Sequence, residues 1–199
     1  MPSPSWELVI DASILRAAGS EGATHPVSTY SRKLLLDILE ICHRGSLSIS
    51  IKEEWATHQS RFSRAWQVQM YSRRKIGNPS GRDCAHLKEA IKSCAGVSEK
   101  QREAAVKDFL LIEAALNGDK IIFSIDKRAR EVYCELSKTI RDFADIFWLN
   151  PIEESPNISA LLKGEIRFKL SGSSILEGGS EATRQDRFPE NRSPAPQAR

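Results

Sequence analysis

Two carboxylates of this sequence directly follow short apolar runs. Asp11 comes after residues 8–10 (LVI) and Asp126 comes soon after residues 121–123 (IIF). Such continuous apolar runs predict strands that are buried on both faces of a parallel sheet. Ligands of open α/β sheets bind at the carboxyl ends of the strands, so both acids are placed for chemistry. For Asp126 an alternative stays open, since an acid there also caps a following helix, an interaction of about 1 kcal/mol.

A third carboxylate, Asp108, lies on the apolar face of an expected helix. The spacing Ser98 to Gln101 predicts a capping box at the start of this helix, and Asn117-Gly118 predicts its end. The residues that share the face of Asp108 are apolar, namely Ala104, Ala105, Leu111, Ile112 and Ala115. Asp108 is therefore expected to point toward the packed side of the helix.

Two further acids open another expected helix. Leu47, Ile49 and Ile51 alternate with serines and predict a short strand, which leads into Lys52-Glu53-Glu54-Trp55. Acids in a first helical turn also complement the helix dipole by about 0.3 to 1 kcal/mol, and this structural interpretation remains an alternative for Glu53 and Glu54.

Convergence of these acids would require a cation. Two unit charges about 5 Å apart repel by roughly 3 kcal/mol at an effective dielectric constant near 20, so a cluster must take up protons or bind a metal ion. Hard carboxylate oxygens favour Mg²⁺ or Mn²⁺. Either ion can generate a hydroxide nucleophile and stabilise the charge that develops on a phosphate during hydrolysis.

The elements that must position the acids alternate along the chain. Strands at residues 8–10, 47–51, 121–123 and 146–149 alternate with helices at 28–42 (Ser28 as N-cap), from 52, 84–94, 98–116 and 128–138. This alternation predicts an α/β fold with a central parallel sheet. The expected organisation is a domain over residues 1–151, an extension over 152–170 and a disordered tail over 171–199. In the extension, residues 158–163 predict a short helix, and Ile166, Phe168 and Leu170 alternate like an edge strand.

A basic stretch separates the second and third acidic segments. Residues 60–82 contain no acid and six cations, Arg61, Arg64, Arg73, Arg74, Lys75 and Arg82, with Trp66 and Tyr71 among them. Cations neutralise phosphates and aromatic rings stack on unpaired bases, so the stretch favours single-stranded RNA. The alternative is a solvated helix face whose aromatic residues belong to the core.

Composition narrows the class of protein. The 199 residues carry a formal net charge of +3, which is too small to identify a partner. Four cysteines without a CxxC pair and an opening without a signal-peptide pattern predict a reduced, cytoplasmic protein. No apolar run approaches the roughly 20 residues of a membrane span. Cys84, His86 and Cys94 have no spacing typical of a zinc site.

Taken in order, the acidic segments resemble the PIN domain. The matching motifs are Asp11-Ala12-Ser13 after the first strand, Glu54 early in a helix, Asp108 in KDFLLIEAAL, and Ser124-Ile125-Asp126 after the next strand. The resemblance covers about residues 7–151 and implies a three-layer α/β/α sandwich with metal-dependent endoribonuclease activity, as in VapC-like toxins. It implies that Asp11, Glu54, Asp108 and Asp126 bind Mg²⁺ or Mn²⁺ and that Ser13 and Ser124 support them. Glu54 matches better than Glu53 because Trp55 follows it. An antitoxin and a second copy of the chain are the implied protein partners.

Two other classes compete with the nuclease interpretation. A non-catalytic RNA-binding protein on a PIN-like fold predicts binding without metal-dependent cleavage. A phosphoacceptor receiver domain also gathers acids at strand ends, but the sequence lacks its paired early acids at Trp6-Glu7 and its lysine at the end of the strand at 146–149. The receiver interpretation is therefore disfavoured.

Overall fold

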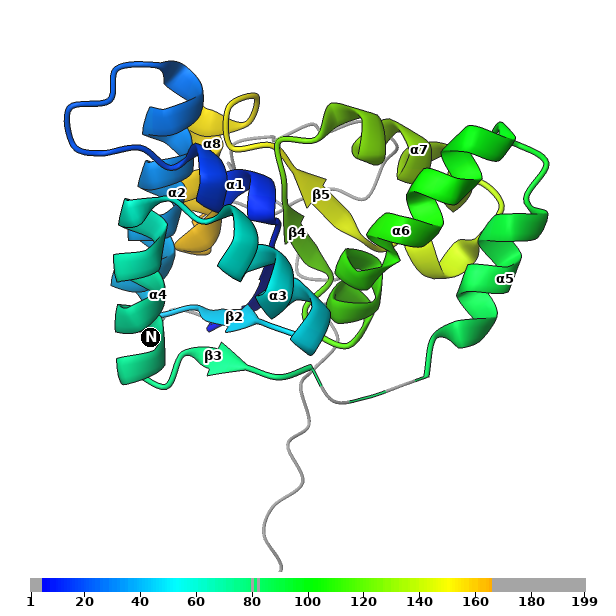
Figure 1. Ribbon diagram of the computed structural model, residues 1–199, viewed down its shortest axis with the longest axis horizontal. Coiled ribbons are helices and arrows are strands. Elements are labelled where there is room, and N and C mark those ends of the chain that lie inside the picture. Colours follow the sequence, from blue (N-terminus) through cyan, green and yellow to red (C-terminus); the bar gives the residue numbers. More distant parts are fainter. Residues whose placement is uncertain (1–4, 80, 82, 166–199) are drawn as a thin grey trace, which may run out of the picture.

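The strands form a single parallel sheet in the part of the chain that the structure describes. This computed structural model describes residues 5–79, 81 and 83–165. Within them, five strands pair in the order β3-β2-β1-β4-β5, and every neighbouring pair is parallel. The strands, visible in Figure 1, are β1 (Glu7–Ile10), β2 (Arg44–Ser46), β3 (Ile76–Gly77), β4 (Ile121–Phe123) and β5 (Phe147–Leu149). The predicted α/β class with a parallel sheet is confirmed.

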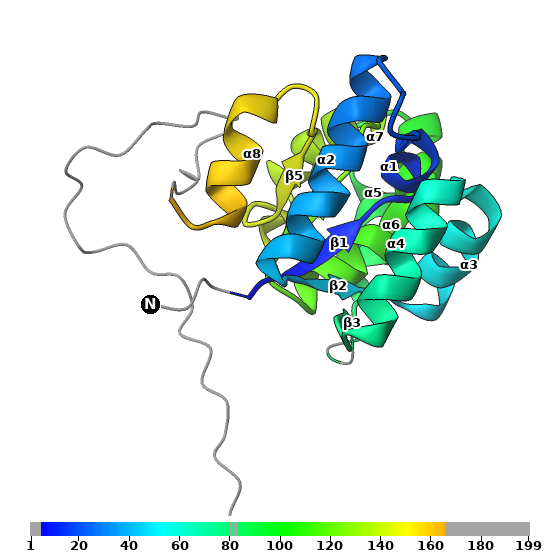
Figure 2. The same cartoon turned by 90° about the vertical axis from the view of Figure 1, so that its left-hand side faces the viewer.

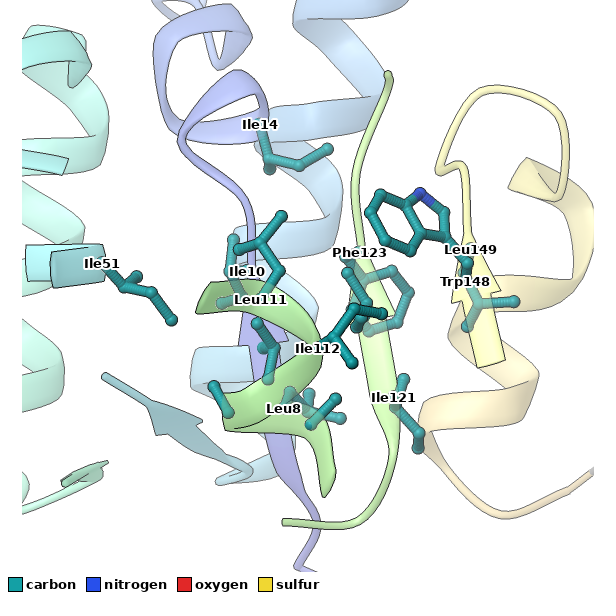
Figure 3. Packing of buried hydrophobic residues seen from close by; sticks show 14 of the residues in the cluster. Leu8, Ile10, Ile14, Ile51, Leu111, Ile112, Ile121, Phe123, Trp148 and Leu149 are labelled. Carbon is teal, nitrogen blue, oxygen red and sulfur yellow. The ribbon is translucent and has the colours of Figure 1, made fainter. Parts of the chain in front are cut away.

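Helices cover both faces of this sheet. Helix α6 packs on one face of β1 and β4, whereas α2 lies on the opposite face with α8 beside it (Figures 2 and 3). The helices of the described residues are α1 (Ala12–Ala17), α2 (Pro26–Ile41), α3 (Ile49–His58), α4 (Arg61–Ser72), α5 (Ala85–Ser93), α6 (Glu99–Leu116), α7 (Lys127–Ser137) and α8 (Ser155–Leu162), with a 3-10 turn η1 (Arg141–Phe143).

The two central strands are buried, as the apolar runs predicted. Leu8, Val9 and Ile10 are inaccessible to solvent, and all three residues of β4 are buried (Figure 3). Strand β1 pairs with β2 on one side and with β4 on the other. Because parallel strands end at the same edge, the residues after Ile10 and Phe123 lie next to each other.

The predicted strand at residues 47–51 is wrong. Strand β2 instead occupies Arg44–Ser46, just before the predicted range. The Ser48 hydroxyl accepts a hydrogen bond from the Ile51 amide and caps α3, which begins at Ile49. Leu47 and Ile51 are buried while Ile49 is 73% exposed. A strand would place Leu47, Ile49 and Ile51 on the same face. The burial of Leu47 and Ile51 without Ile49 instead fits the start of a helix, where residues four positions apart share a face.

Other boundaries differ for short-range reasons. Helix α2 begins at Pro26, two residues before Ser28, because proline lacks the amide hydrogen that a first helical residue leaves unused. The predicted capping box of α6 is confirmed, since the Ser98 hydroxyl accepts from the Gln101 amide and the Gln101 side chain accepts from the Ser98 amide at 2.9 Å. Helix α1 and the two-residue β3 are too short to give a periodic signal.

The described part of the extension packs into the same core. Helix α8 overlaps the short helix predicted at 158–163, begins three residues earlier, and buries Ile158, Leu161 and Leu162. The expected edge strand at residues 166, 168 and 170 and the tail over 171–199 lie outside the described residues. The four cysteines all lie in the described part of the chain, and none of them forms a disulfide. Among the described helices, none has the length and apolar character needed to cross a membrane.

Candidate active site

Strand pairing brings the segments of Asp11 and Asp126 together. Ile10 pairs with Phe123, and the Asp11 amide donates a 2.9 Å hydrogen bond to the Phe123 carbonyl. Both strands end there, so the loop over residues 124–126 lies beside the start of α1. The predicted crevice at the carboxyl ends of β1 and β4 therefore contains both acids.

Two hydroxyl groups hold the Asp11 carboxylate. The Ser124 hydroxyl donates to Oδ2 of Asp11 at 2.6 Å, and the Ser13 hydroxyl donates to the same oxygen. Ser124 in turn accepts the Asp126 amide at 3.0 Å, and Ser13 accepts the Ile125 amide at 3.4 Å. Each serine thus donates its one hydroxyl proton to Asp11 and fixes the backbone of the loop after β4.

Trp55 orients the acid that precedes it in α3. Its ring is fully buried, and its indole N–H donates to the Ile10 carbonyl at 2.9 Å, which attaches α3 to the end of β1. Glu54 is consequently half-buried beside Asp11, whereas Glu53 is exposed. Burial and the negative charge of Asp11 raise the pKa of Glu54.

Asp108 lies half-buried on α6. Phe109, Leu111 and Ile112 next to it are buried, although Ala104, expected on the same packed face, is exposed. Burial, followed by the charges of Asp126, Asp11 and Glu54, raises the pKa of Asp108 to about 6. The other three acids are therefore close enough to act on this carboxyl electrostatically.

These side chains line one pocket, which we call the acidic pocket. It has a volume of about 50 Å³, whereas a single water needs on the order of 10 to 15 Å³. A small ion with a few waters fits this space and a nucleotide does not. The lining residues are Asp11, Glu54, Asp108, Ser124 and Asp126, with Leu110, Leu111, Ala129 and Trp148.

Asp126 fulfils the structural alternative as well. Its Oδ1 accepts the Ala129 amide at 3.0 Å, which caps α7 as predicted. The same residue lines the acidic pocket from an exposed position. Capping occupies one carboxylate oxygen, so the two roles are compatible.

The donors of the acidic pocket suit a hard divalent cation. Four carboxylates supply oxygen ligands of the kind that Mg²⁺ and Mn²⁺ prefer. Burial first, and then the charges of neighbouring acids, raise the pKa values of Glu54 and Asp108. In the part of the chain that the structure describes, no group of three or more His, Cys, Asp or Glu side chains is close enough together to hold a metal ion.

The predicted RNA-binding residues are divided between two edges of the sheet. Helix α4 starts at Arg61, beside α1, because the Ser60 hydroxyl donates to the Ala18 carbonyl at 2.6 Å. Its 12 residues span about 18 Å and lead into β3, whose start lies at the opposite edge (Figure 1). Arg61 and Arg64 thus lie toward the carboxyl ends of the strands, which is the edge that carries the acids. Arg73, Arg74 and Lys75 lie at the opposite edge, where the strands begin.

Individual members of the basic stretch also differ in their contacts. The Arg73 guanidinium donates to the Leu39 carbonyl at 3.0 Å and so connects α4 with α2. Trp66 is buried and donates to the Leu35 carbonyl at 2.6 Å, which agrees with the core alternative, whereas Tyr71 is 45% exposed. Arg82 lies outside the described residues.

Two features of the pocket were missed in the sequence. The basic side chains of His58 and Lys107 partly oppose the rise in the pKa of Glu54, so both lie near the acids. Lys107 could have been found from its position beside Asp108. Trp148 lines the pocket although it belongs to β5, whose apolar pattern predicted only a strand.

Comparisons with protein families, with curated proteins and with solved structures gave no match.

Proposed function

We propose that this chain is a PIN-like, metal-dependent endoribonuclease that hydrolyses RNA phosphodiester bonds. The observation that carries the proposal is the acidic pocket, where Asp11, Glu54, Asp108 and Asp126 come together from four separate segments. Their order along the chain, after β1, in the middle of α3, within α6 and after β4, matches the order of the motifs that resemble the PIN domain.

The four carboxylates are the proposed ligands of Mg²⁺ or Mn²⁺. The bound ion would supply an activated water and stabilise the charge that develops on the phosphate. Ser13 and Ser124 orient Asp11 by donating to Oδ2, and in the described part of the chain no donor contacts its Oδ1. Hydrogen bonds of this kind, made by residues that do not touch the metal, fix the direction in which a ligand points and thereby strengthen metal binding.

The size of the pocket determines how RNA would approach. Since the pocket is too small for a base, the scissile phosphate reaches it from the open side while the nucleotides stay outside. Arg61 and Arg64 are exposed toward this edge, and Lys107 is exposed beside Asp108. These cations are placed to offset the repulsion between the acids and the RNA backbone.

The test is RNA cleavage in Mg²⁺, Mn²⁺ or EDTA. The parent should cleave in either metal and lose activity in EDTA. Asp11→Asn and Asp126→Asn should each abolish cleavage while the protein stays folded, as judged by its circular dichroism spectrum. Asp142→Asn is a matched control, because Asp142 is an exposed acid on η1, away from the acidic pocket.

A parent protein that binds RNA and does not cleave it in any metal would contradict the proposal and support the RNA-binding alternative. Cleavage that persists in both Asn variants would show that the chemistry lies elsewhere. The antitoxin and the second copy of the chain implied by the resemblance remain predictions.

A further inference from the structure

Trp148 has a buried hydrogen-bond donor without a partner at the edge of the acidic pocket. The residue is only 9% exposed and lines the pocket with the four acids. Within the described residues, its indole nitrogen is shielded from solvent and makes no hydrogen bond. The other two deeply buried tryptophans, Trp55 and Trp66, both donate to backbone carbonyls. Buried donors are nearly always paired, so this exception requires an explanation.

The ring of Trp148 is held in place by its neighbours. It stacks on Tyr133 with centroids 5.5 Å apart and an interplanar angle of 23°. Tyr133 is itself fixed, because its hydroxyl donates to the Ala105 carbonyl in α6 at 2.6 Å. In Figure 3 the indole nitrogen lies on the side of the ring that faces the carboxyl end of β4. The donor therefore points to the edge that carries the acids and cannot easily turn to another acceptor.

A neutral donor at this position suits an anionic oxygen. The pocket's own acids repel a phosphate, and an added cationic side chain would compete with a metal ion for them. An indole N–H attracts a phosphate oxygen without changing the charge of the site, and hydrogen bonds to charged acceptors are the stronger ones. The pocket is too small for a base, so the acceptor is a group of phosphate size.

We propose that the indole N–H of Trp148 donates a hydrogen bond to a non-bridging phosphate oxygen of the RNA held at the acidic pocket. Trp148 is then a substrate-binding residue. The inference rests on the proposed function, because it takes RNA as the source of the phosphate. Since the nitrogen is shielded, the side chains around it must open slightly to admit the oxygen.

The direct test is a nuclear magnetic resonance titration of the ¹⁵N-labelled full chain. The sequence has four tryptophans, so the indole region has four signals, and Trp148→Phe identifies that of Trp148. A short single-stranded RNA is added in Ca²⁺, which occupies oxygen-ligand sites as Mg²⁺ does. We expect the Trp148 signal to move downfield as the RNA binds, while those of Trp55 and Trp66 stay. Inorganic phosphate is added in a parallel titration to test whether phosphate suffices.

The matched pair of variants is Trp148→Phe and Trp6→Phe. Both keep an aromatic ring, and Trp6 precedes β1 at the opposite edge of the sheet. Trp148→Phe should bind the RNA about 10-fold more weakly, the loss of one hydrogen bond to a charged group. The smaller ring fills less of the buried space, so this variant should melt somewhat lower than the parent, and binding is compared at a temperature where both proteins are folded. Trp6→Phe should leave the affinity unchanged.

The outcomes separate this inference from the proposed function. If the parent cleaves RNA in Mg²⁺ but the Trp148 signal does not move and Trp148→Phe binds normally, the inference is wrong and the nuclease assignment stands. If the signal already lies at a hydrogen-bonded position without RNA, the donor is paired in the free protein and the inference is also wrong. If the parent neither binds nor cleaves RNA, both fail together.

Discussion

The hydroxyl of Ser124 donates a 2.6 Å hydrogen bond to Oδ2 of Asp11 and thereby joins the ends of β4 and β1. Ser124 is 1% exposed, so this bond is formed away from bulk water. The same oxygen of Ser124 accepts the Asp126 amide at 3.0 Å. One buried serine therefore fixes the carboxylate after the first strand and the backbone of the acid after the fourth.

Replacing Ser124 should weaken the site more than the fold. In Ser124→Ala the Asp11 carboxylate loses one donor and the Asp126 amide loses its acceptor. We expect cleavage to fall about 10- to 100-fold, as for other outer-shell partners of metal ligands, and the free energy of unfolding to fall by about 1 kcal/mol. Ser124→Thr keeps the hydroxyl and should recover most of the activity. Equal rates for Ser124→Ala and the parent would show that Asp11 needs no such support.

Asp108→Asn should stabilise the metal-free protein at neutral pH. The pKa of Asp108 is about 6 in the folded protein, against 3.8 ordinarily, so ionisation of this carboxyl opposes folding. The folded state binds more protons than the unfolded state between pH 3.8 and 6, and stability is lost as the pH rises through this window. In EDTA at pH 7.5 the variant should gain roughly 1 to 3 kcal/mol over the parent, and this gain should vanish below about pH 4.

With bound metal, the parent should be more stable than Asp108→Asn, the reverse of the order expected in EDTA. A cation at 100 times its dissociation constant stabilises a folded protein by about 2.7 kcal/mol, and Asp108→Asn should receive much less of this stabilisation. Melting curves of both proteins with excess Mn²⁺ and with EDTA make the comparison. A variant that is less stable in EDTA and still gains the full Mn²⁺ shift would remove Asp108 from the acidic pocket.

Glu54→Gln and Glu53→Gln form a matched pair. Glu54 lines the pocket and Glu53 is exposed, although they are neighbours in α3. Loss of a residue that only supports a metal ligand lowers activity by roughly 10- to 100-fold, and Glu54→Gln should lower the cleavage rate by at least as much. Glu53→Gln should cleave like the parent. The reverse order would mean that the motif is shifted by one residue.

The two ends of α4 should contribute unequally to RNA binding. If Arg61 and Arg64 contact phosphates, the double Ala variant should reduce the slope of log affinity against log salt by about 1.4 for a single strand. Arg74→Ala with Lys75→Ala removes the same charge at the opposite edge and should leave the slope unchanged. A larger effect of the second pair would place the RNA path at the far edge of the sheet.

His43 should make the protein less stable in mild acid. Its Nδ1 accepts the Trp6 amide at 3.1 Å, and Nε2 is 2.8 Å from the Leu162 carbonyl, so the neutral ring connects the chain before β1 with α8. Burial lowers the pKa of His43 from 6.5, with a further lowering by Lys75 opposed by the Leu162 bond and by Asp119. The unfolded state then binds more protons below pH 6.5, and stability is lost as the pH falls from there.

Denaturant unfolding between pH 5 and 8 measures this effect. His43→Gln should be less stable than the parent at pH 7.5, because the glutamine amide cannot reproduce both contacts in the same geometry. The difference between the two proteins should shrink as the pH falls below 6.5. A constant difference over the whole range would show that His43 does not titrate on unfolding.

The sequence by itself determined the local features. The apolar runs at residues 8–10 and 121–123 predicted strands buried on both faces, and an acid after each could be read directly. The capping box at Ser98 and the cap at Asp126 depend on neighbours within three residues, and both were correct. The start of α3 was misassigned because Ser48 was read as part of an alternation and acts as a cap.

Only the tertiary structure decided which segments meet. Strand order is set by long-range pairing that leaves no local signal, so the sequence could not place β4 beside β1 or bring Ser124 to Asp11. The direction of α4 separated basic residues that are contiguous in sequence, because a helix carries its two ends to opposite edges of the sheet. The unpaired donor of Trp148 likewise depends on what surrounds a ring after packing, which no residue pattern records.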